Sequence, residues 1–316
     1  MTEIGINFWK ADERTTTFSI AVANDAAGPF TTVINSATSA ASGVTVETEQ
    51  LFNLEGTIGR YVKFIGIGNS SATNWTSIAN VNIYGDINCE MVFLDAKLFL
   101  GGPFDSNTNL MNDDLRANSL IPMVEPYSAL GILPVNHAGG ETIEDGAVLT
   151  ATGNTVVVDW VFVELCDKND PATILASRSG LLHRDGSITD VDGSSSLLFD
   201  GLGDDDYYVA IRHRNHLRVR SSLALSLSRS VSSTVDFTST TSPITLTGEQ
   251  KNEGGTLVLW SGDCNSDNSV NAADRSISWN DRNQSGYLTS DNNMDGYTNA
   301  ADRSICWNNR NKVGIP

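Results

Sequence analysis

Two stretches near the C-terminus repeat each other: Asp263-Cys-Asn265-Ser-Asp267-Asn-Ser-Val270-Asn-Ala-Ala-Asp274 and Asp291-Asn-Asn293-Met-Asp295-Gly-Tyr-Thr298-Asn-Ala-Ala-Asp302. The second begins 28 residues after the first, at 291 against 263, and the likeness continues through Trp279 and Trp307. In each stretch an acid or amide stands at positions 1, 3 and 5, and an acid closes it at position 12. Alternating oxygen donors of this kind are typical of a loop that wraps a hard cation.

Calcium is the cation that this spacing favours. In a twelve-residue calcium loop, side-chain oxygens bind at positions 1, 3, 5 and 12, and a backbone carbonyl binds at position 7. The predicted Ca²⁺ ligands are Asp263, Asn265, Asp267, Ser269 and Asp274, then Asp291, Asn293, Asp295, Tyr297 and Asp302. Position 6 needs a positive φ, which Gly296 adopts freely and Asn268 tolerates. Position 12 is Asp where an EF-hand has Glu, so the strict EF-hand pattern is not met.

A short helix is predicted after each loop. Asn271 and Asn299 suit the N-cap position, and an acid stands three residues beyond each of them. The apolar stripe expected to pack against the other helix consists of Val270, Ala273 and Ile277, with Thr298, Ala301 and Ile305 in the copy. Runs of Asp, Asn and Gly also form ordinary turns. Two copies in register favour ion-binding loops over plain turns.

Residues 262–311 therefore resemble a dockerin, the paired calcium-loop-helix module of secreted bacterial proteins. The resemblance implies bound calcium and an extracellular or cell-surface location. Positions 10 and 11 are Ala272-Ala273 and Ala300-Ala301, which departs from the family. Capture by a cohesin-type receptor is therefore left open.

The composition excludes several classes of partner. Asp and Glu number 38 against 20 Lys and Arg, for a formal net charge of −18. Such a balance repels nucleic acid and anionic membranes and favours divalent cations. No apolar run reaches the roughly 18 residues of a membrane span, and the longest lies around Thr155–Leu165. Met1-Thr-Glu-Ile-Gly shows no export signal, so we expect a segment or processed product of a longer protein.

The four cysteines are too few for a disulfide scaffold. Cys264 and Cys306 lie in the two repeats, where antiparallel packing of the helices would bring them together. A disulfide between them is one hypothesis, and two free thiols are the other. Cys89 and Cys166 are either a second bridge or buried free thiols.

Residues 1–87 consist of short alternating runs between Asp, Gly, Asn and Ser clusters, which predicts strands and turns. The predicted strands are Ile4–Trp9, Thr17–Val22, Phe30–Ile34, Arg60–Ile67 and Ile78–Tyr84. The order of features resembles the C-terminal half of a discoidin-type (galactose-binding-like) jelly roll. The resemblance is carried by Phe8-Trp9-Lys10, Arg14, Phe18-Ser-Ile20, Phe30, Gly59-Arg60-Tyr61-Val62-Lys63, Gly68-Asn69, Asn74-Trp75 and Val81-Asn-Ile83-Tyr84-Gly85.

Discoidin-type modules bind sugars or other polar surface ligands, so the resemblance implies a polysaccharide or cell-surface glycan as ligand. Tyr61, Asn74 and Trp75 are the candidate contacts, although the two aromatic residues of this motif are more often core residues. The N-terminal half of the family's domain has no counterpart in residues 1–87. Arg60–Ile67 and Ile78–Tyr84 look like central strands, being apolar with a single lysine. An open β edge is therefore expected to pair with another copy or with an upstream segment.

Residues 88–258 are predicted to form a second β-sandwich. The predicted strands are Met91–Leu100, Val156–Leu165, Ile174–Arg178, Ser196–Phe199, Tyr207–Arg214, Leu223–Leu227 and Gly255–Trp260. Val156–Leu165 is apolar on both faces, as a central strand is. The stretch resembles a module found ahead of terminal calcium repeats in large bacterial surface proteins, carried by Asn112–Arg116, Pro126-Tyr127, Val158–Leu165 and Tyr208–His216. That resemblance implies a location and no activity.

Three polar groups of this region have alternative roles. His213 and His216 are metal-ligand types, but a spacing of three along a strand points them to opposite faces, which favours structural or surface roles. Asp185–Gly193 carries enough acids for an ion, yet acid-glycine pairs are ordinary in hairpin turns. Asp204-Asp205-Asp206 is expected to be a solvated tip.

No catalytic motif is present: there is no G-x-S-x-G, no H-E-x-x-H and no phosphate-binding glycine loop. The predicted fold is mostly β, with jelly-roll-like sandwich segments at 1–87 and 88–258 and a small α calcium-loop-helix (dockerin-like) module at 259–316. The predicted function is non-catalytic attachment or assembly at a bacterial surface. The alternatives are a filament subunit completed by strand donation, and an accessory region of a secreted polysaccharide-degrading enzyme.

Overall fold

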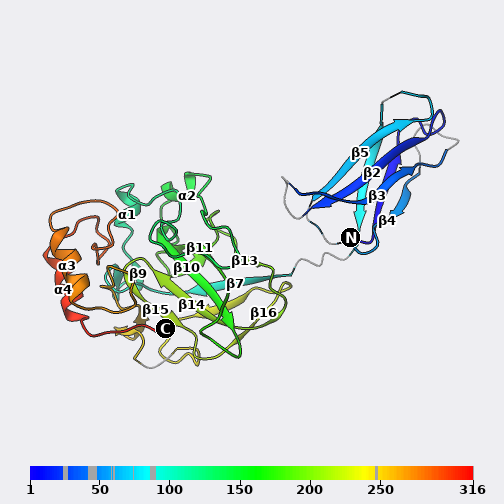
Figure 1. Ribbon diagram of the computed structural model, residues 1–316. Coiled ribbons are helices and arrows are strands. Elements are labelled where there is room, and N and C mark those ends of the chain that lie inside the picture. The colour runs from blue at the N-terminus through cyan, green and yellow to red at the C-terminus, as the bar shows by residue number, and fades with distance from the viewer. Residues whose placement is uncertain are drawn as a thin grey trace. The chain divides into compact units, whose positions relative to one another are not determined.

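The computed structural model divides the chain into two compact units, Met1–Cys89 and Glu90–Pro316 (Figure 1). It describes residues 1–23, 28–41, 48–57, 59, 61–73, 75–85, 90–245 and 248–315. Strands dominate both units, so the chain is mostly β, as predicted. The two candidate calcium loops lie in unit 2, together with the strands expected for the second sandwich.

Unit 1 contains two three-stranded antiparallel sheets, ordered β4-β1-β6 and β3-β2-β5. Its strands are β1 Glu3–Phe8, β2 Thr16–Ala23, β3 Thr31–Thr38, β4 Gln50–Asn53, β5 Tyr61–Asn69 and β6 Ile78–Tyr84. The inward side chains of β1 and β2 form the core, where the rings of Phe8 and Phe18 lie 5.5 Å apart. Alternation of apolar and polar residues predicts every strand of this unit except β4.

Strands β5 and β6 lie at sheet edges. Among the described residues, β5 pairs only with β2 and β6 only with β1. The prediction that these two are central strands is therefore wrong. One side of each strand packs on the core, through Phe64 and Ile78, while the other side faces outward, with Ile67 49% and Ile83 50% exposed. The central places belong to β1 and β2, and β2 is buried along nearly its whole length.

Unit 2 is built on a nine-stranded sheet with the order β13-β7-β12-β11-β10-β14-β15, to which β16 and β17 add at β14 and β7. Its strands are β7 Met91–Lys97, β10 Val157–Asp167, β11 Ile174–His183, β12 Ser187–Thr189, β13 Leu197–Asp200, β14 Asp205–His213, β15 His216–Arg220, β16 Leu225–Leu227 and β17 Ser233–Asp236. Two small hairpins accompany it, β8 Phe104–Asp105 with β9 Leu110–Met111, and β18 Lys251–Glu253 with β19 Thr256–Val258.

Strand β10 is the buried centre of this sheet. All its residues except the last are buried, which confirms the expectation of a strand covered on both faces. Tyr127 packs beside it and donates its hydroxyl to the carbonyl of Trp160 at 2.9 Å. The buried acid Glu164 accepts from Arg212 and Arg218, each at 2.7 Å. The buried acids of β10 are thus paired with cations, as burial of charge requires.

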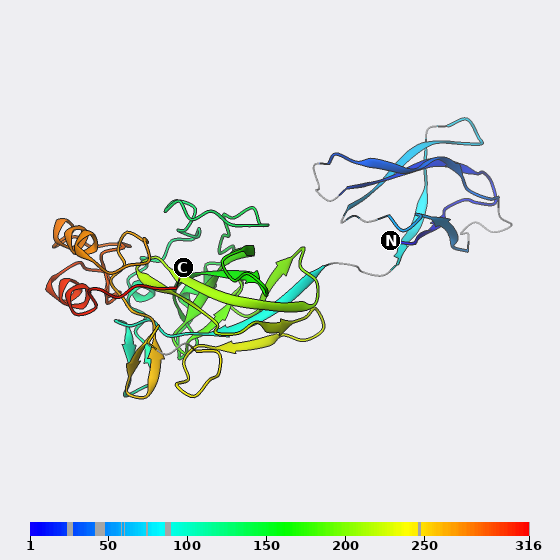
Figure 2. The same cartoon turned by 60° about the horizontal axis from the view of Figure 1, so that its bottom comes forward.

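The helices are short. They are α1 Asp114–Ala117, α2 Ala147–Thr150, α3 Ala272–Asn280 and α4 Ala300–Asn308. Helices α3 and α4 follow the two repeated loops, as predicted, and lie side by side in both views (Figures 1 and 2). None of the helices in the described ranges is long and apolar enough to cross a membrane.

Candidate metal centres

The first repeated loop folds around its own acidic side chains. Asp263 at position 1 accepts hydrogen bonds from the backbone N–H groups of Asp267 at 3.0 Å and Asn268 at 2.9 Å. Asp274 at position 12 accepts from the N–H of Asn265 at 3.3 Å. The Asn265 amide donates to the Asp267 carboxylate at 2.8 Å. The side chains at positions 1, 3, 5 and 12 are therefore engaged with one short stretch of loop backbone.

The second loop repeats these contacts. Asp291 accepts from the N–H groups of Asp295 at 3.2 Å and Gly296 at 2.8 Å. Asp302 accepts from the N–H of Asn293 at 3.2 Å, and the Asn293 amide donates to Asp295 at 2.8 Å. Two separate stretches of chain with the same spacing of acids therefore form the same set of hydrogen bonds.

Position 7 is fixed in the same way in both loops. The N–H of Ser269 donates to Asp267 at 3.0 Å, and the N–H of Tyr297 donates to Asp295 at 2.9 Å. These two residues, predicted to offer carbonyl ligands, therefore stand at equivalent turns of the chain.

Backbone conformation also repeats between the loops. Position 6 has φ +66° at Asn268 and +88° at Gly296, which confirms the sequence expectation. Position 4 is left-handed too, with φ +57° at Ser266 and +60° at Met294, which the sequence does not indicate. A non-glycine residue in this region costs roughly 1–3 kcal/mol. Strain at the same position in both copies means that the surrounding contacts enforce the loop shape.

The predicted helix caps are confirmed. Asn271 and Asn299 each accept from the N–H two residues further on at 2.7 Å. In return, Asp274 accepts from the Asn271 N–H at 2.8 Å, and Asp302 accepts from the Asn299 N–H at 2.7 Å. Both helices thus begin with a capping box. In both copies, one carboxylate oxygen of the acid at position 12 accepts from a loop N–H, and the other oxygen accepts from the N-cap N–H of the helix.

The predicted apolar stripe of these helices is wrong in part. Val270 is buried, but Ala273 is exposed and Ile277 is only half-buried. The buried helix residues are Asp274 and Ser278 in α3, and Asp302 and Cys306 in α4. The acid must lie inside because it bonds to the loop backbone, and this turns the more polar face of the helix inward.

The acids at positions 1 and 12 are withdrawn from solvent. Asp263 is 3% exposed, and Asp274, Asp291 and Asp302 are fully buried. Burial raises the pKa of Asp263 to about 7, and the nearby Asp274 charge adds to this. Burial likewise raises the pKa of Asp291 to about 7. The loop N–H groups, and for Asp291 also the Arg214 charge, therefore do not offset the cost of burying these carboxylates.

These donors suit calcium in chemistry, since a set of carboxylate, amide and carbonyl oxygens is what this cation prefers. Within the described ranges, no group of three His, Cys, Asp or Glu side chains is gathered closely enough to hold a metal ion. The loop carboxylates bond instead to the backbone N–H groups of their own loops.

Cys264 and Cys306 are buried free thiols, so the hypothesis of a disulfide between them is wrong. The Cys264 sulfur lies 3.5 Å from the Ser278 hydroxyl and 3.6 Å from the side-chain oxygen of Asn292. It is therefore directed at polar groups of α3 and the second loop. Burial raises the pKa of the Cys264 thiol to about 12, which keeps it protonated. Cys166 is also free and buried, whereas Cys89 lies outside the described residues.

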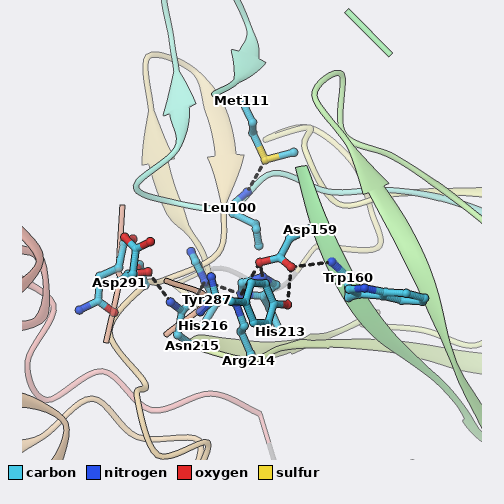
Figure 3. A network of polar contacts seen from close by, with 12 residues as sticks. Leu100, Met111, Asp159, Trp160, His213, Arg214, Asn215, His216, Tyr287 and Asp291 are labelled. Atoms are coloured by element: carbon cyan, nitrogen blue, oxygen red, sulfur yellow. Dashed lines mark hydrogen bonds and ion pairs between the residues drawn. The ribbon is translucent and has the colours of Figure 1, made fainter. Parts of the chain in front are cut away.

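A buried polar network, which the sequence does not reveal, lies beside the loops (Figure 3). Its centre is Asp159 on β10, which accepts from Arg214 Nε at 3.0 Å and from the Tyr287 hydroxyl at 2.5 Å, and lies 3.2 Å from His213 Nε2. Burial by itself would raise the pKa of Asp159. The Arg214 charge and the His213 hydrogen bond outweigh burial, so this pKa lies well below its usual range.

His213 and His216 are brought together, contrary to the expectation of opposite faces. They pair across the two-residue turn Arg214-Asn215 between β14 and β15, and their Nδ1 atoms are 2.9 Å apart. The expectation fails because it treats 213–216 as one continuous strand. Burial lowers the pKa of both imidazoles, and the charge of His213 further lowers the pKa of His216. Both histidines are enclosed structural groups, in line with the structural role that the sequence favours.

The glycan-contact candidates of unit 1 are exposed. Trp75 is 75% exposed and Tyr61 is 42% exposed, so the alternative core role is wrong for both. Trp75 follows β5, and its carbonyl accepts from the Asn69 amide at 2.7 Å. Asn74 lies outside the described residues.

The other acid-rich stretches of unit 2 form turns and surface ion pairs. In the 185–193 stretch, Asp190 pairs with Arg178 at 2.6 Å, and Asp192 accepts from two following backbone N–H groups, each at 2.8 Å. At the acidic tip, Asp205 pairs with Lys168 at 2.5 Å. These acids already have partners, which agrees with the turn and surface roles.

The chain matches no protein-family model, and no curated protein matches it in sequence. Among solved structures it is similar to the CBM32 of AlyQ in complex with 4,5-unsaturated mannuronic acid, at 30% identity over 27% of this chain and 61% of that chain, with a TM-score of 0.23. It is also similar to a chain of a type II Cohesin-X-Dockerin complex from Acetivibrio cellulolyticus, at 14% identity over 70% of this chain and 96% of that chain, with a TM-score of 0.34. A third similar structure is truncated AlyQ with CBM32 and alginate lyase domains, at 17% identity over 70% of this chain and 67% of that chain, with a TM-score of 0.23.

The chain spans 61% of the length of the first of these structures. TM-scores of 0.23 to 0.34 mean that the likenesses are too partial to assign a function to this chain.

Proposed function

We propose that unit 2 is a calcium-stabilised, non-catalytic module of an extracellular bacterial surface protein that works in attachment or assembly. The observation that carries the proposal is the pair of loops with matched contacts around four buried acids. The residues that would hold Ca²⁺ are Asp263, Asn265, Asp267, Ser269 and Asp274 in one loop, and Asp291, Asn293, Asp295, Tyr297 and Asp302 in the other. The ion would supply the further positive charge that is needed to offset the burial of these carboxylates.

A non-catalytic role fits the other titratable groups of unit 2. Asp159, His213 and His216 have shifted pKa values, as catalytic groups often do. All three are buried and bonded to one another or to neighbouring chain groups. The cavity beside the two histidines has a volume of about 10 Å³, which is room for a single water at most. A substrate has no access to these side chains.

The test of the calcium proposal is a titration of the full chain by isothermal calorimetry after treatment with a chelator. We expect two calcium ions per chain for the wild type, and one for either Asp274→Ala or Asp302→Ala. The matched control is Asp204→Ala, which removes an exposed acid outside the loops and should leave two ions. If the folded wild-type chain takes up no calcium, the loops are ordinary turns and the proposal is wrong.

Assembly through unit 1 is the second candidate role, favoured by the position of β5 and β6 at sheet edges. Exposed apolar side chains line both strands, including Ile65, Ile67, Val81 and Ile83. Such edges invite pairing with a strand from another chain or from an upstream segment. A strand donated from one copy to the next forms a head-to-tail contact, which extends into a filament unless it closes.

Glycan binding by unit 1 is a further candidate, supported by the exposure of Trp75 and Tyr61. An exposed indole offers a flat apolar face on which a sugar ring can stack. In this role the chain would serve as an accessory region of a secreted polysaccharide-degrading enzyme or as an adhesive surface module.

A further inference from the structure

The turn between β14 and β15 lies in the interior of unit 2. Its two residues, Arg214 and Asn215, are 1% and 0% exposed. Connections between strands normally run over the surface, because buried backbone groups need partners. This turn finds its partners in the two candidate calcium loops, so it is an internal contact between the sheet and both loops.

Asn215 touches both loops at the same motif position. Its backbone carbonyl accepts from the N–H of Asp263 at 3.1 Å, and Asp263 is position 1 of the first loop. Its side-chain amide donates to the carbonyl of Asp291 at 2.7 Å, and Asp291 is position 1 of the second loop. One residue therefore holds the backbone at the first ligand of each loop.

Arg214 keeps Asn215 in place. Its guanidinium pairs with Asp159 on β10 at 3.0 Å and lies 4.2 Å from the Tyr287 ring centre (Figure 3). It also donates to the Leu288 carbonyl. Its own carbonyl accepts from Ser266 of the first loop at 3.1 Å. Moving the turn would break a buried ion pair, which is strongly disfavoured. The turn is thus held rigidly between the sheet and the two loops.

We propose that Asn215 is a positioning residue that couples the two loops, so that they take up calcium with positive cooperativity. The inference rests on the proposed calcium-binding function. The first ion orders its loop and fixes the position-1 backbone against Asn215, and this leaves less ordering for the second ion to impose. Coupling between sites of this kind typically changes affinity by about 5-fold to 150-fold.

The test is calcium titration of the full chain, read as the ratio of the second to the first stepwise binding constant. We expect Asn215→Ala to bind two ions but to lower this ratio by about 5-fold or more relative to wild type. The matched control is Asn309→Ala, because Asn309 is also buried and donates to a backbone carbonyl, that of Ser261, at 2.8 Å. It loses a similar hydrogen bond without touching position 1 of either loop, so its ratio should equal that of wild type.

A second measurement serves if Asn215→Ala does not fold. Asp302→Ala removes the second site, and the coupling then predicts that the first loop binds calcium about 5-fold or more weakly. Calcium uptake with an unchanged ratio in Asn215→Ala, an equal fall in Asn309→Ala, or an unchanged first-loop affinity in Asp302→Ala would overturn the coupling alone. An absence of uptake by wild type would overturn the proposed calcium function as well.

Discussion

At the scale of single residues, Asp159 joins segments that are far apart in the chain. Its hydrogen-bond partners Arg214 and Tyr287 lie 55 and 128 residues away in sequence. A buried ion pair adds little net stability over apolar packing, but removal of one partner costs about 3–5 kcal/mol because the other charge stays buried. The pair therefore specifies which segments meet, and so fixes the C-terminal loops against the sheet.

The buried histidines predict a loss of stability of unit 2 in mild acid. Burial lowers the pKa of His183, His213 and His216 below the unfolded value of 6.5. The unfolded chain therefore takes up protons that the folded unit refuses, and stability falls as the pH drops from 7 to 5. We expect a loss of up to about 2 kcal/mol for each histidine, measured by calorimetric melting in saturating calcium.

Unit 1 is the internal control for this experiment, because residues 1–89 contain no histidine. The experiment needs saturating calcium because Asp263 and Asp291 change stability in the opposite direction when calcium is removed by a chelator. Their pKa is raised in the folded state, so the stability of unit 2 is then lost as the pH rises from about 4 to 7. A melting temperature of unit 2 that is constant from pH 7 to 5 would show that the histidines titrate freely in the folded state.

At the scale of elements, helices α3 and α4 show a local motif overriding an amphipathic pattern. Each is nine residues long, which is too short to be stable without tertiary support. The capping box ties the first turn to the loop, and the buried acid then decides which face points inward. The strands of unit 1 are not set by a local motif. Whether a strand is central or at an edge depends on which distant segments pair with it.

The edge position of β5 and β6 predicts concentration-dependent assembly that lysine substitutions should block. We expect filaments or oligomers of the wild-type chain in electron micrographs, and monomers of Ile67→Lys with Ile83→Lys, because a charge on an edge strand disfavours further pairing. Ser71→Lys, which adds a single lysine at an exposed turn outside the strands, is the control and should assemble like wild type. Wild-type material that stays monomeric at every concentration would exclude self-assembly through these strands.

At the scale of the whole molecule, the candidate roles fall on different units. The exposed aromatic residues and open strand edges belong to unit 1, and the paired loops belong to unit 2. Each unit has a hydrophobic core of its own. A glycan-binding role is therefore expected to be independent of calcium.

Affinity gel electrophoresis of the whole chain against acidic and neutral polysaccharides checks this independence. A polysaccharide that slows the wild-type chain should slow it equally in chelator, and Trp75→Ala should lose most of the effect because a stacking surface is removed. Trp279→Ala, which removes a 56% exposed tryptophan of unit 2, is the control. Retardation that survives in Trp75→Ala would place the glycan contact elsewhere.

The sequence by itself determined what depends on neighbouring residues. Alternation located most of the longer strands, and a continuous apolar run located β10. Spacing located the repeated loops, the positive φ at Asn268 and Gly296, and the capping boxes. These features follow from side-chain periodicity and from hydrogen bonds that span only a few residues.

Only the tertiary structure decided what depends on distant segments. It placed β5 and β6 at sheet edges, paired His213 with His216 across a turn, and left Cys264 and Cys306 unbonded. It also set Asn215 between both loops, 48 residues before Asp263 and 76 before Asp291. No local pattern encodes which segments pack together, because that choice minimises the energy of the whole core, including the burial and pairing of charges such as Asp159 and Arg214.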